Sequence, residues 1–482
     1  MKKIYECFEK KIYTEKVLQF GEGNFIRAFV DWIIDEMNNA GYFNGSAVVV
    51  QPRKNDKIKI INEQNGLFTL YLNGIKNKEV VSMHSIVSSI SRGINAYSDY
   101  DEFLKVAENP ELRFITSNTT EAGIVYEEKD SLEDRPQSSF PGKLTAFLYH
   151  RYLVFGGNAD KGCIFLPCEL IDNNGKRLKE IILKSAVQWN LDEGFIKWIN
   201  EANTFCNTLV DRIVPGYPID KKEEITKELG YEDKLLAEGE QFHLWVIEGP
   251  QWVKDEFPAE KAGLNVLFVD DLTPYRERKV RILNGAHTSM VPVSYLYGKD
   301  TVKDAVEDGV LGKFIRDAIY DEIIPTLKLP GDELTDFADA VLDRFNNPFI
   351  KHYLMSISLN SISKFKTRVL PSILEYQMIN NHLPVRLVFS LAALIAFYKG
   401  ERDGVKIDLN DDEDILALFE SLWAEYDGTR QKLNSLVEKV LGYDKIWGMD
   451  LNNTDGLCEQ AADYLEVILR KGMKEAVHTF FN

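Results

Sequence analysis

Residues 17–31 read VLQFGEGNFIRAFVD, an apolar run that meets two glycines and then turns into an amphipathic pattern. In a strand–turn–helix unit, Gly21 would allow the tight bend and Gly23 would let a ligand approach the backbone closely. The N–H groups at the start of the following helix would point at an anion, which makes a nucleotide pyrophosphate the expected ligand. The third glycine of the dinucleotide fingerprint is missing, however, because Ile26 stands in its place. A plain joint between a strand and a helix explains a lone Gly-x-Gly turn equally well.

The residues after the glycines favour the nucleotide interpretation. Phe25, Phe29 and Ile33 recur at helical spacing, so they form an apolar stripe that can pack on a sheet. Asn24 suits the N-cap position, which leaves the N-terminus of the helix available to phosphate. We therefore predict cofactor contacts at both glycines and at three residues of the first helical turn, Asn24, Phe25 and Arg27.

The composition describes a globular chain that is too long for one ordinary core. Its 482 residues, of which 45% are hydrophobic, indicate two domains. The formal net charge of −18 argues against nucleic acid or an anionic membrane as the partner, since both need a basic footprint. Five cysteines form no CxxC pair, which favours reduced thiols, and the N-terminus lacks the apolar core of a signal peptide. We therefore expect a cytoplasmic protein that acts on a small molecule.

Two regimes of hydrophobic pattern divide the chain near residue 275. Before it, short β-rich runs alternate with helical stretches, which predicts an α/β domain with a doubly wound parallel sheet at residues 1–275. After it the period is helical, so residues 276–482 should form a mostly α-helical domain. The apolar run LVFSLAALIAFY at residues 387–398 is too short to span a bilayer and predicts a buried helix. The predicted strands are residues 16–20, 46–52, 67–74, 78–87, 113–118, 163–171 and 264–271.

The second predicted strand leaves the identity of a dinucleotide cofactor open. It ends at Gln51, where an NAD enzyme often places an acidic residue that binds the adenosine ribose. Arg53 and Lys54 follow, and a neutral amide with two cations nearby would tolerate a 2′-phosphate. These residues alone are almost equally compatible with NAD and NADP.

A second polar constellation lies in KVRILNGAHTSMVP at residues 279–292. At about 100° per residue, Asn284 and His287 fall within roughly 140° of Lys279 around a helix, so the three share half of its surface. A lysine in a dry pocket can exchange a proton with a substrate oxygen, an asparagine can donate to an alkoxide, and a histidine can orient hydroxyls. These roles fit a redox step between a ketone and an alcohol. The competing interpretation is a solvated amphipathic helix, which the apolar neighbours weaken.

Five stretches together resemble the mannitol dehydrogenase family, the polyol-specific long-chain dehydrogenases. The resemblance spans nearly the whole chain, and several ordered motifs are more specific than any one of them. Within the family, LQFGEGNFIRAFVDW, HLWVIEGP at residues 243–250 and ILNGAHTSMVP are most similar to members that act on keto sugar acids. The five stretches are GEGNFIRAF, TSNTTEAGI at 116–124, NTLVDRIVPGYP at 207–218, the K-x-x-x-x-N-x-x-H pattern at 279–287 and RFNNP at 344–348.

This resemblance implies an N-terminal Rossmann-type domain, a mostly helical C-terminal domain and metal-independent hydride transfer with NAD. It also implies that Lys279 is the general acid and base, with Asn284 and His287 beside it. The expected reaction is the reversible reduction of a ketone in a sugar acid. The neighbouring specificities of the family, for fructuronate and for mannitol, are the alternatives.

One departure from the family concerns a second asparagine that would stabilise the alkoxide. Mannitol dehydrogenases carry it in a motif resembling SCDNL, whereas the matching stretch here is PCELI, which puts Leu170 at that position. Asn118 is the favoured replacement and an expected cofactor contact, because the carboxyl ends of strands bind the ligand in a doubly wound sheet. Asn173 and Asn174, just past PCELI, are the other candidates.

A basic cluster in the second half is suited to the carboxylate of a sugar acid. A carboxylate that leaves water needs charge-assisted hydrogen bonds, which arginine and lysine supply. Arg344 lies in RFNNP, and Lys364 and Arg368 are four residues apart, so these two share one face if their segment is helical. We predict that all three bind the substrate.

Two functions of other classes stay open on the residues alone. A methyltransferase also carries closely spaced glycines between its first strand and helix, although it has no need of the Lys-Asn-His pattern. A catalytically silent sensor of sugar acids would need only the binding residues. The remaining histidines show no metal-ligand spacing, so we expect no metal and treat most of them as structural.

Overall fold

The structure is a computed structural model that describes residues 1–53, 57–76, 79–120 and 122–481. The chain divides into two compact units, one of Met1–Asn73 and Val80–Leu272, the other of Gly74–Glu79 and Thr273–Asn482. The predicted fold class is confirmed, since an α/β first half is followed by a largely helical second half. Across the part of the chain that the structure describes, none of the helices combines the length and the apolar character that a bilayer crossing requires.

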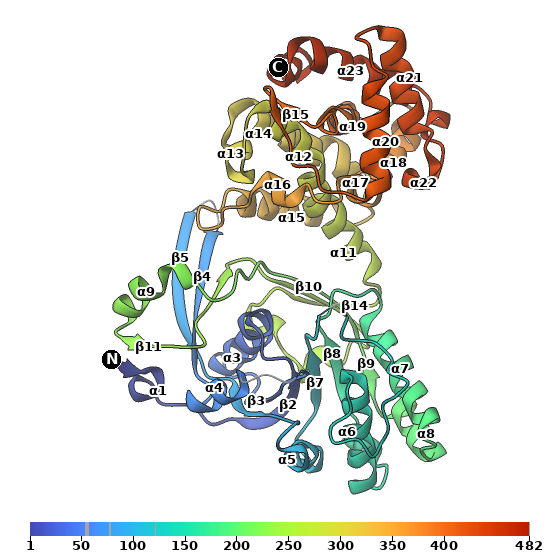
Figure 1. The fold of residues 1–482 in the computed structure, drawn as a ribbon. Helices are drawn as coiled ribbons and strands as arrows, with labels where there is room; N and C mark the ends of the chain where they lie inside the picture. Colours follow the sequence, from blue (N-terminus) through green and yellow to red (C-terminus); the bar gives the residue numbers. More distant parts are fainter. Residues whose placement is uncertain (54–56, 77–78, 121, 482) are drawn as a thin grey trace. The chain divides into compact units, whose positions relative to one another are not determined.

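In the described part of the first unit, six parallel strands form one sheet in the order β6-β3-β2-β7-β8-β9 (Figure 1). The order begins in the middle with β2 and steps outwards to both sides, which is the doubly wound arrangement. The predicted parallel sheet is therefore confirmed. Its strands are β2 (Thr14–Phe20), β3 (Gly45–Val50), β6 (Ile90–Ile94), β7 (Phe114–Ser117), β8 (Ile164–Pro167) and β9 (Thr204–Phe205).

Alternate residues of the central strands pack against helices on opposite faces of this sheet. Val17 belongs to the core cluster that includes helix α3 (Trp32–Asn39). Leu18 and Phe20 belong to the cluster that includes α6 (Phe140–Val154). This division follows from the two-residue period of a strand. Because both faces are covered, the central strands read as almost continuous apolar runs.

Three predicted strands lie outside the central sheet, which corrects their assignment to it. β4 (Phe68–Lys76) pairs with β5 (Glu79–Val87) and with β12 (Ala237–Glu240) in a second sheet. β14 (Val266–Val269) pairs with β13 (Leu244–Glu248) in a third sheet. The apolar pattern identified these segments as strands, but a pattern along the chain does not reveal which distant strand completes their hydrogen bonds.

The second unit is built from helices around α19 (Val385–Phe397), which is buried throughout residues 387–397. This confirms the buried helix predicted from the apolar run. Helices α12 (Ala286–Tyr297) and α23 (Leu457–Lys471) pack against α19. The other helices that position predicted site residues are α11 (Thr273–Arg278), α15 (Gly331–Phe345), α17 (Ser361–Arg368) and α18 (Leu370–Asn380).

Two helices that carry predicted site residues contain a π-helical segment. One segment is Arg27–Asp31, between α2 (Asn24–Ile26) and α3, and the other is Lys279–Gly285, between α11 and α12. The rotation of about 100° per residue assumed for residues 279–292 is therefore wrong over the first half of that stretch. The hydrogen bonds of a π-helix join residues five apart, so residues i and i+5 come close to alignment. Such a widened turn leaves no mark in the apolar period of the sequence.

Candidate active site

The turn after β2 is held in a conformation that needs glycine. Gly21 has φ +129°, and a Cβ atom there would lie 3.0 Å from the carbonyl oxygen of Asn118. The Gly21 N–H donates to the Val50 carbonyl at 3.1 Å, which ties the turn to the end of β3. A Cβ atom on Gly23 would instead meet no described atom within 4 Å. Gly21 thus shapes the turn, whereas Gly23 leaves open space in front of the helix.

Two buried residues, Gln19 and Asp31, stabilise the turn through hydrogen bonds. Gln19 Nε2 donates to the Gly21 carbonyl at 3.1 Å and to Asp31 Oδ2 at 3.0 Å. Both side chains are buried, and burial raises the pKa of Asp31 to about 7, against the opposing effects of Gln19 and Arg27. Sequence analysis missed both residues. The available signal was a polar side chain in the middle of an apolar strand.

The start of the helix differs from the prediction, because Gly23 and not Asn24 occupies the N-cap position. The Asn24 side chain instead accepts a hydrogen bond from Arg27 Nη2 at 2.7 Å. Arg27 also donates to the backbone carbonyls of Glu22 and Leu235. Because Arg27 is buried and donates to these protein acceptors, its guanidinium stabilises the turn.

The space around the turn fits the pyrophosphate of a dinucleotide. The helix N-terminus is open at Gly23, and N–H groups at such an end favour a phosphate. Phe25 is half-buried beside it, and its ring stacks on Phe29 with the two centroids 5.2 Å apart. The turn therefore combines a closely approachable backbone with a rigid apolar support.

The end of β3 also fits a dinucleotide. Gln51 is buried, and its Nε2 donates to Asn95 Oδ1 at 3.1 Å. Its Oε1 is buried and has no hydrogen-bond partner in the described residues, so one acceptor is left for a ribose hydroxyl. Arg53 is exposed, and Lys54 lies outside the described residues.

Leu170, at the position of the family's second asparagine, is exposed over 62% of its surface. Asn174 is buried, and its amide nitrogen donates to three backbone carbonyls, so it has a structural role. Asn118 is half-buried, and its Nδ2 donates to the Cys168 carbonyl at 3.1 Å, in the same PCELI stretch. Asn118 is the better placed of these two amides to reach a ligand.

In the second unit, the three predicted catalytic residues lie on one continuous helix, made of the π-helical segment Lys279–Gly285 and α12. Lys279 and Asn284 are half-buried, whereas His287 is only 8% exposed. Lys279 and Asn284 are five residues apart, so the π-helical geometry brings them towards one line along the helix. An ordinary α-helix would set the two side chains farther apart around its axis.

Two arginines on the same helix have partners on neighbouring helices of the second unit. Arg281 donates two hydrogen bonds, of 2.6 and 3.0 Å, to Glu375 on α18. The guanidinium of Arg278 lies 4.5 Å from the ring centre of Phe337 on α15. Both arginines are buried. The helix is therefore packed on several sides, which argues against a solvated amphipathic helix.

His287 is surrounded by aromatic and cationic side chains. Its ring centre lies 4.3 Å from that of Phe345 and 4.9 Å from that of His352. Burial lowers the pKa of His287 well below its ordinary value, and His352, Arg344 and Arg368 lower it further. Within the described ranges, His287 Nε2 is buried without a hydrogen-bond partner. A neutral imidazole with one unused nitrogen suits a substrate hydroxyl.

Helix α17 brings the predicted carboxylate ligands Lys364 and Arg368 towards the helix that carries the predicted catalytic residues. A Cβ atom on Gly285 would lie 2.9 Å from the Arg368 carbonyl oxygen, so the end of α17 packs closely on the π-helical segment. Lys364 and Arg368 share one face, because residues 361–368 are helical. Lys364 Nζ donates to the Ile357 carbonyl at 2.9 Å. The charges of Arg344 and Arg368 lower the pKa of His287. Lys364 lies one helical turn before Arg368 on α17.

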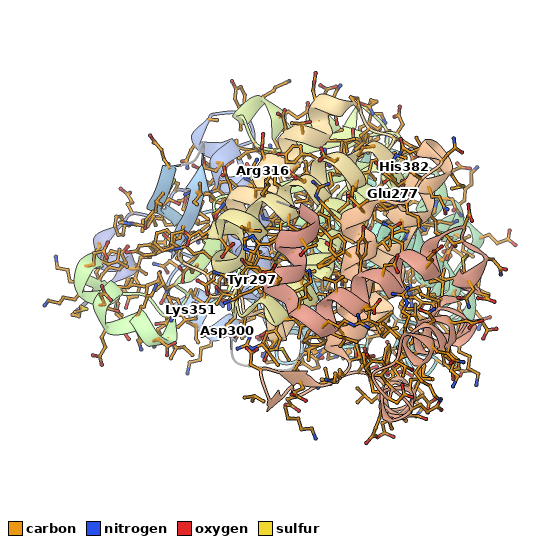
Figure 2. The ribbon with its side chains drawn as sticks, turned by 90° about the horizontal axis from the view of Figure 1, so that it is seen from above. Glu277, Tyr297, Asp300, Arg316, Lys351 and His382 are labelled. Carbon is orange, nitrogen blue, oxygen red and sulfur yellow. The ribbon has the colours of Figure 1, made fainter. Side chains whose placement is uncertain are left out.

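A backbone bridge between two segments brings His352 to His287. The Val302 N–H donates to the His352 carbonyl at 2.9 Å, and the Leu354 N–H donates to the Asp300 carbonyl at 2.9 Å. Figure 2 labels one residue from each of the two segments, Asp300 from the first and Lys351, which precedes His352, from the second. Sequence analysis gave His352 no role of its own, although it lies in the basic cluster between Arg344 and Lys364. Its signal was its place in that cluster, just after RFNNP.

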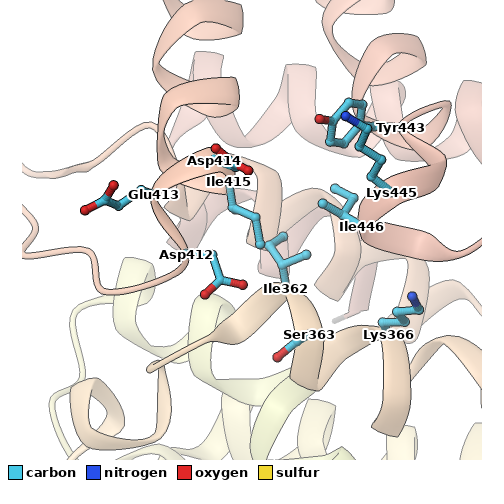
Figure 3. A pocket seen from close by; sticks show the side chains of 10 residues that line it. All are labelled: Ile362, Ser363, Lys366, Asp412, Glu413, Asp414, Ile415, Tyr443, Lys445 and Ile446. Carbon is cyan, nitrogen blue, oxygen red and sulfur yellow. The ribbon is translucent and has the colours of Figure 1, made fainter.

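A separate pocket of about 530 Å³ lies on the other face of α17 (Figure 3). Ile362 and Lys366 line it, and at about 100° per residue they point away from Lys364 and Arg368. The pocket is therefore not part of the predicted substrate site. Neither here nor elsewhere in the described chain do three or more His, Cys, Asp or Glu side chains gather to hold a metal ion.

Comparisons with known proteins assign the chain to a family. Residues 15–261 match the model of the mannitol dehydrogenase Rossmann domain, and residues 271–469 match that of the mannitol dehydrogenase C-terminal domain. The chain belongs to the mannitol dehydrogenase family. The resemblance inferred from the motifs is thereby confirmed, and with it the Rossmann-type first domain and the oxidoreductase class.

Relatives of this mannitol dehydrogenase family member cover nearly its whole length. Altronate oxidoreductase of Bacillus subtilis (strain 168) is 54% identical over 479 residues, which cover 99% of this chain and 97% of the relative. Altronate oxidoreductase of Escherichia coli O1:K1 / APEC is 50% identical over 466 residues, which cover 96% of each chain. The resemblance to sugar-acid members of the family is therefore confirmed.

Two solved structures of dehydrogenases share the fold. A D-sorbitol dehydrogenase in substrate-free form gives a TM-score of 0.79 at 24% identity and covers 96% of this chain and 95% of its own. Pseudomonas fluorescens mannitol 2-dehydrogenase, a ternary complex with NAD and D-mannitol, gives a TM-score of 0.63 at 22% identity. That match covers 97% of this chain and 94% of the other.

Proposed function

We propose that this chain is a tagaturonate reductase, also called altronate oxidoreductase, which interconverts D-tagaturonate and D-altronate with NADH and NAD in hexuronate catabolism. The observation that carries the proposal is an identity of 54% and 50% with two altronate oxidoreductases, over 99% and 96% of the chain. Altronate is a sugar acid, so its enzyme needs cationic groups for a carboxylate. The cations around His287 support this assignment.

NAD is the cofactor of the proposed reaction. Support comes from the Pseudomonas fluorescens enzyme, which shares the fold and was solved with NAD and D-mannitol. In this chain Gly21, Gly23 and the helix N-terminus hold the pyrophosphate, while Gln51 accepts a hydrogen bond from the ribose. Asn24, Phe25 and Asn118 border the same site, and Arg27 braces it from inside. NADH, when bound, supplies the hydride that the ketone carbon receives.

Lys279, Asn284 and His287 have separate roles in the proposed reaction. Lys279 protonates the ketone oxygen during reduction and takes the proton back during oxidation. Asn284 donates a hydrogen bond to the same oxygen while negative charge develops on it. His287, kept neutral by burial and by its cationic neighbours, orients substrate hydroxyls through Nε2.

The proposed substrate contacts are Arg344, Lys364 and Arg368, which receive the carboxylate. Arg344 and Arg368 act electrostatically on His287, which supports their proximity to the catalytic residues. The ammonium of Lys364 also binds the Ile357 carbonyl, so its contribution is partly structural. A fork of guanidinium donors suits a carboxylate better than a lysine point charge does.

The experiment that tests this function is the oxidation of NADH and NADPH with tagaturonate, fructuronate, fructose and tagatose as acceptors. We expect the highest kcat/KM with NADH and tagaturonate. A preference for fructuronate would move the chain to a neighbouring specificity of the family. A preference for fructose over every keto acid would make it a mannitol 2-dehydrogenase and remove the need for an anion site.

A further inference from the structure

The rings of His352 and His287 form a T-shaped contact, and none of the roles assigned above uses His352. The two ring centroids are 4.9 Å apart and the ring planes meet at 77°. His287 is buried and His352 is half-buried, so the second imidazole is the more accessible of the two. An added charge on either ring would be felt strongly by the other at this separation.

The backbone fixes His352 in this place. Its carbonyl accepts from the Val302 N–H, and the next residue, Tyr353, forms a bridge with Thr301. The Leu354 N–H then bonds to the Asp300 carbonyl. Because two backbone hydrogen bonds join residues 300–302 to residues 352–354, the ring of His352 is presented to His287 by a tethered segment rather than by a free loop.

The charged groups that act on His287 are all cationic, and burial opposes a proton on either imidazole. Arg344 and Arg368 both lower the pKa of His287, and Arg368 also lowers that of Lys364. Burial lowers the pKa of His352. A proton on His352 would therefore be opposed by burial, and it would stand beside the buried ring of His287, on which Arg344 and Arg368 already act. An entering carboxylate reverses this balance, because an opposite charge within a few ångströms favours the protonated imidazole.

We propose that His352 is a specificity-determining residue, which takes up a proton from solvent and donates a hydrogen bond to the substrate carboxylate between Arg344 and Arg368. The inference rests on the proposed function, since it requires an anionic substrate. The neutral ring gains one proton from solvent, which forms one N–H bond on a ring nitrogen, and no bond of the substrate is made or broken. A neutral ketose of the same size gives His352 no counter-charge, so it leaves the ring uncharged.

This coupling gives binding a defined dependence on pH. When the bound complex holds a proton that the free enzyme lacks, the affinity is highest at low pH and falls as the pH rises. The Michaelis constant for a keto sugar acid should therefore increase from pH 6 to pH 9. The affinity for neutral tagatose should stay constant over the same range, because His352 does not titrate when it binds.

The test compares the full-length protein with the variants His352→Asn and His352→Gln, which cannot carry a proton there. Calorimetry in two buffers of different ionisation enthalpy measures proton uptake when tagaturonate binds to the NAD complex, which cannot react. We expect uptake by the parent protein and none by either variant. At pH 6.5 the variants should bind tagaturonate roughly tenfold or more weakly and tagatose unchanged. Lys351→Gln, which removes an exposed charge one residue away, should behave like the parent.

Two results would overturn the inference. The first is a parent protein that binds tagaturonate without taking up a proton, which needs no variant to observe. The second is proton uptake and affinity at parent levels in both His352 variants, which would assign the proton to another group. The failure of the proposed function looks different, because a parent protein that reduces fructose but no keto acid has no anionic substrate to couple.

Discussion

The carbonyl oxygen of Asn118 lies 3.0 Å from the point where a Cβ atom would stand on Gly21. The turn after β2 therefore packs closely on the residue that follows β7, and this packing joins the carboxyl ends of two neighbouring strands. Gly21 also has φ +129°, a conformation that L residues rarely adopt. The same residue type is thus required by the backbone angle and by the space.

We expect Gly21→Ala to destabilise the first unit and to abolish tight NADH binding. The forced backbone angle costs about 1–3 kcal/mol, and the Asn118 carbonyl must move in addition. Thermal melting measures the first effect, and fluorescence titration with NADH measures the second. Normal melting together with normal affinity would show that the turn is freely deformable.

Gly23→Ala should affect the cofactor without affecting stability. Gly23 has φ −70° and ψ 171°, which any residue can adopt, and its Cβ position is open. The added methyl group would occupy the space through which a phosphate approaches. We therefore expect unchanged melting and NADH affinity lowered by roughly tenfold or more. Unchanged affinity would place the pyrophosphate elsewhere.

Lys279→Met should slow the chemical step. If Lys279 transfers the proton, the turnover number with tagaturonate should fall by roughly 10²-fold or more. Methionine keeps most of the apolar stem of the half-buried lysine, so the fold and the NADH affinity should survive. Steady-state NADH oxidation supplies the measurement, and a variant with near-normal turnover would remove Lys279 from the mechanism.

Asp31→Asn should change how stability depends on pH. The pKa of Asp31 is raised to about 7 in the folded protein from 3.8, chiefly by burial. Between these values the folded state binds a proton that the unfolded state releases, so this group's contribution is fully present at low pH and is lost as the pH rises to about 7. Each pKa unit corresponds to about 1.4 kcal/mol.

The variant cannot titrate at this position, and its Oδ1 can still accept from Gln19 Nε2. Urea unfolding at pH 5 and pH 8 should therefore show that Asp31→Asn gains stability relative to the parent as the pH rises, by a few kcal/mol at most. Parallel curves for the two proteins would mean that Asp31 stays ionised throughout.

Features of the fold that depend on neighbouring residues could be predicted from the sequence, whereas features that depend on distant segments could not. The glycine turn, the strands around it and the buried helix at residues 387–398 leave local patterns, and those predictions are confirmed. The sheet partners of β4 and β14 are set by distant strands, and their placement was wrong. Local patterns report burial and period but not the distant partner.

The same limit applies to the site. Lys279, Asn284 and His287 were singled out because they lie close together in the sequence, yet the π-helical segment that aligns two of them was not foreseen. His352 reaches His287 only through a backbone bridge with residues 300–302, which no spacing along the chain could reveal. Residue types predicted the chemistry, and tertiary structure added the second imidazole.

The charge on Arg368 should decide whether a sugar acid is preferred to a neutral ketose. Arg368 is half-buried, burial lowers its pKa, and it acts on His287. Losing a desolvated partner of a charge typically costs about 2–5 kcal/mol, so Arg368→Ala should raise the Michaelis constant for tagaturonate by roughly 30-fold or more. Lys366→Ala is the matched control, since it removes a cation from the opposite face of α17. Activity on tagatose should be the same in both variants, because a neutral ketose makes no use of the charge. Equal Michaelis constants for tagaturonate in the two variants would show that the carboxylate binds elsewhere.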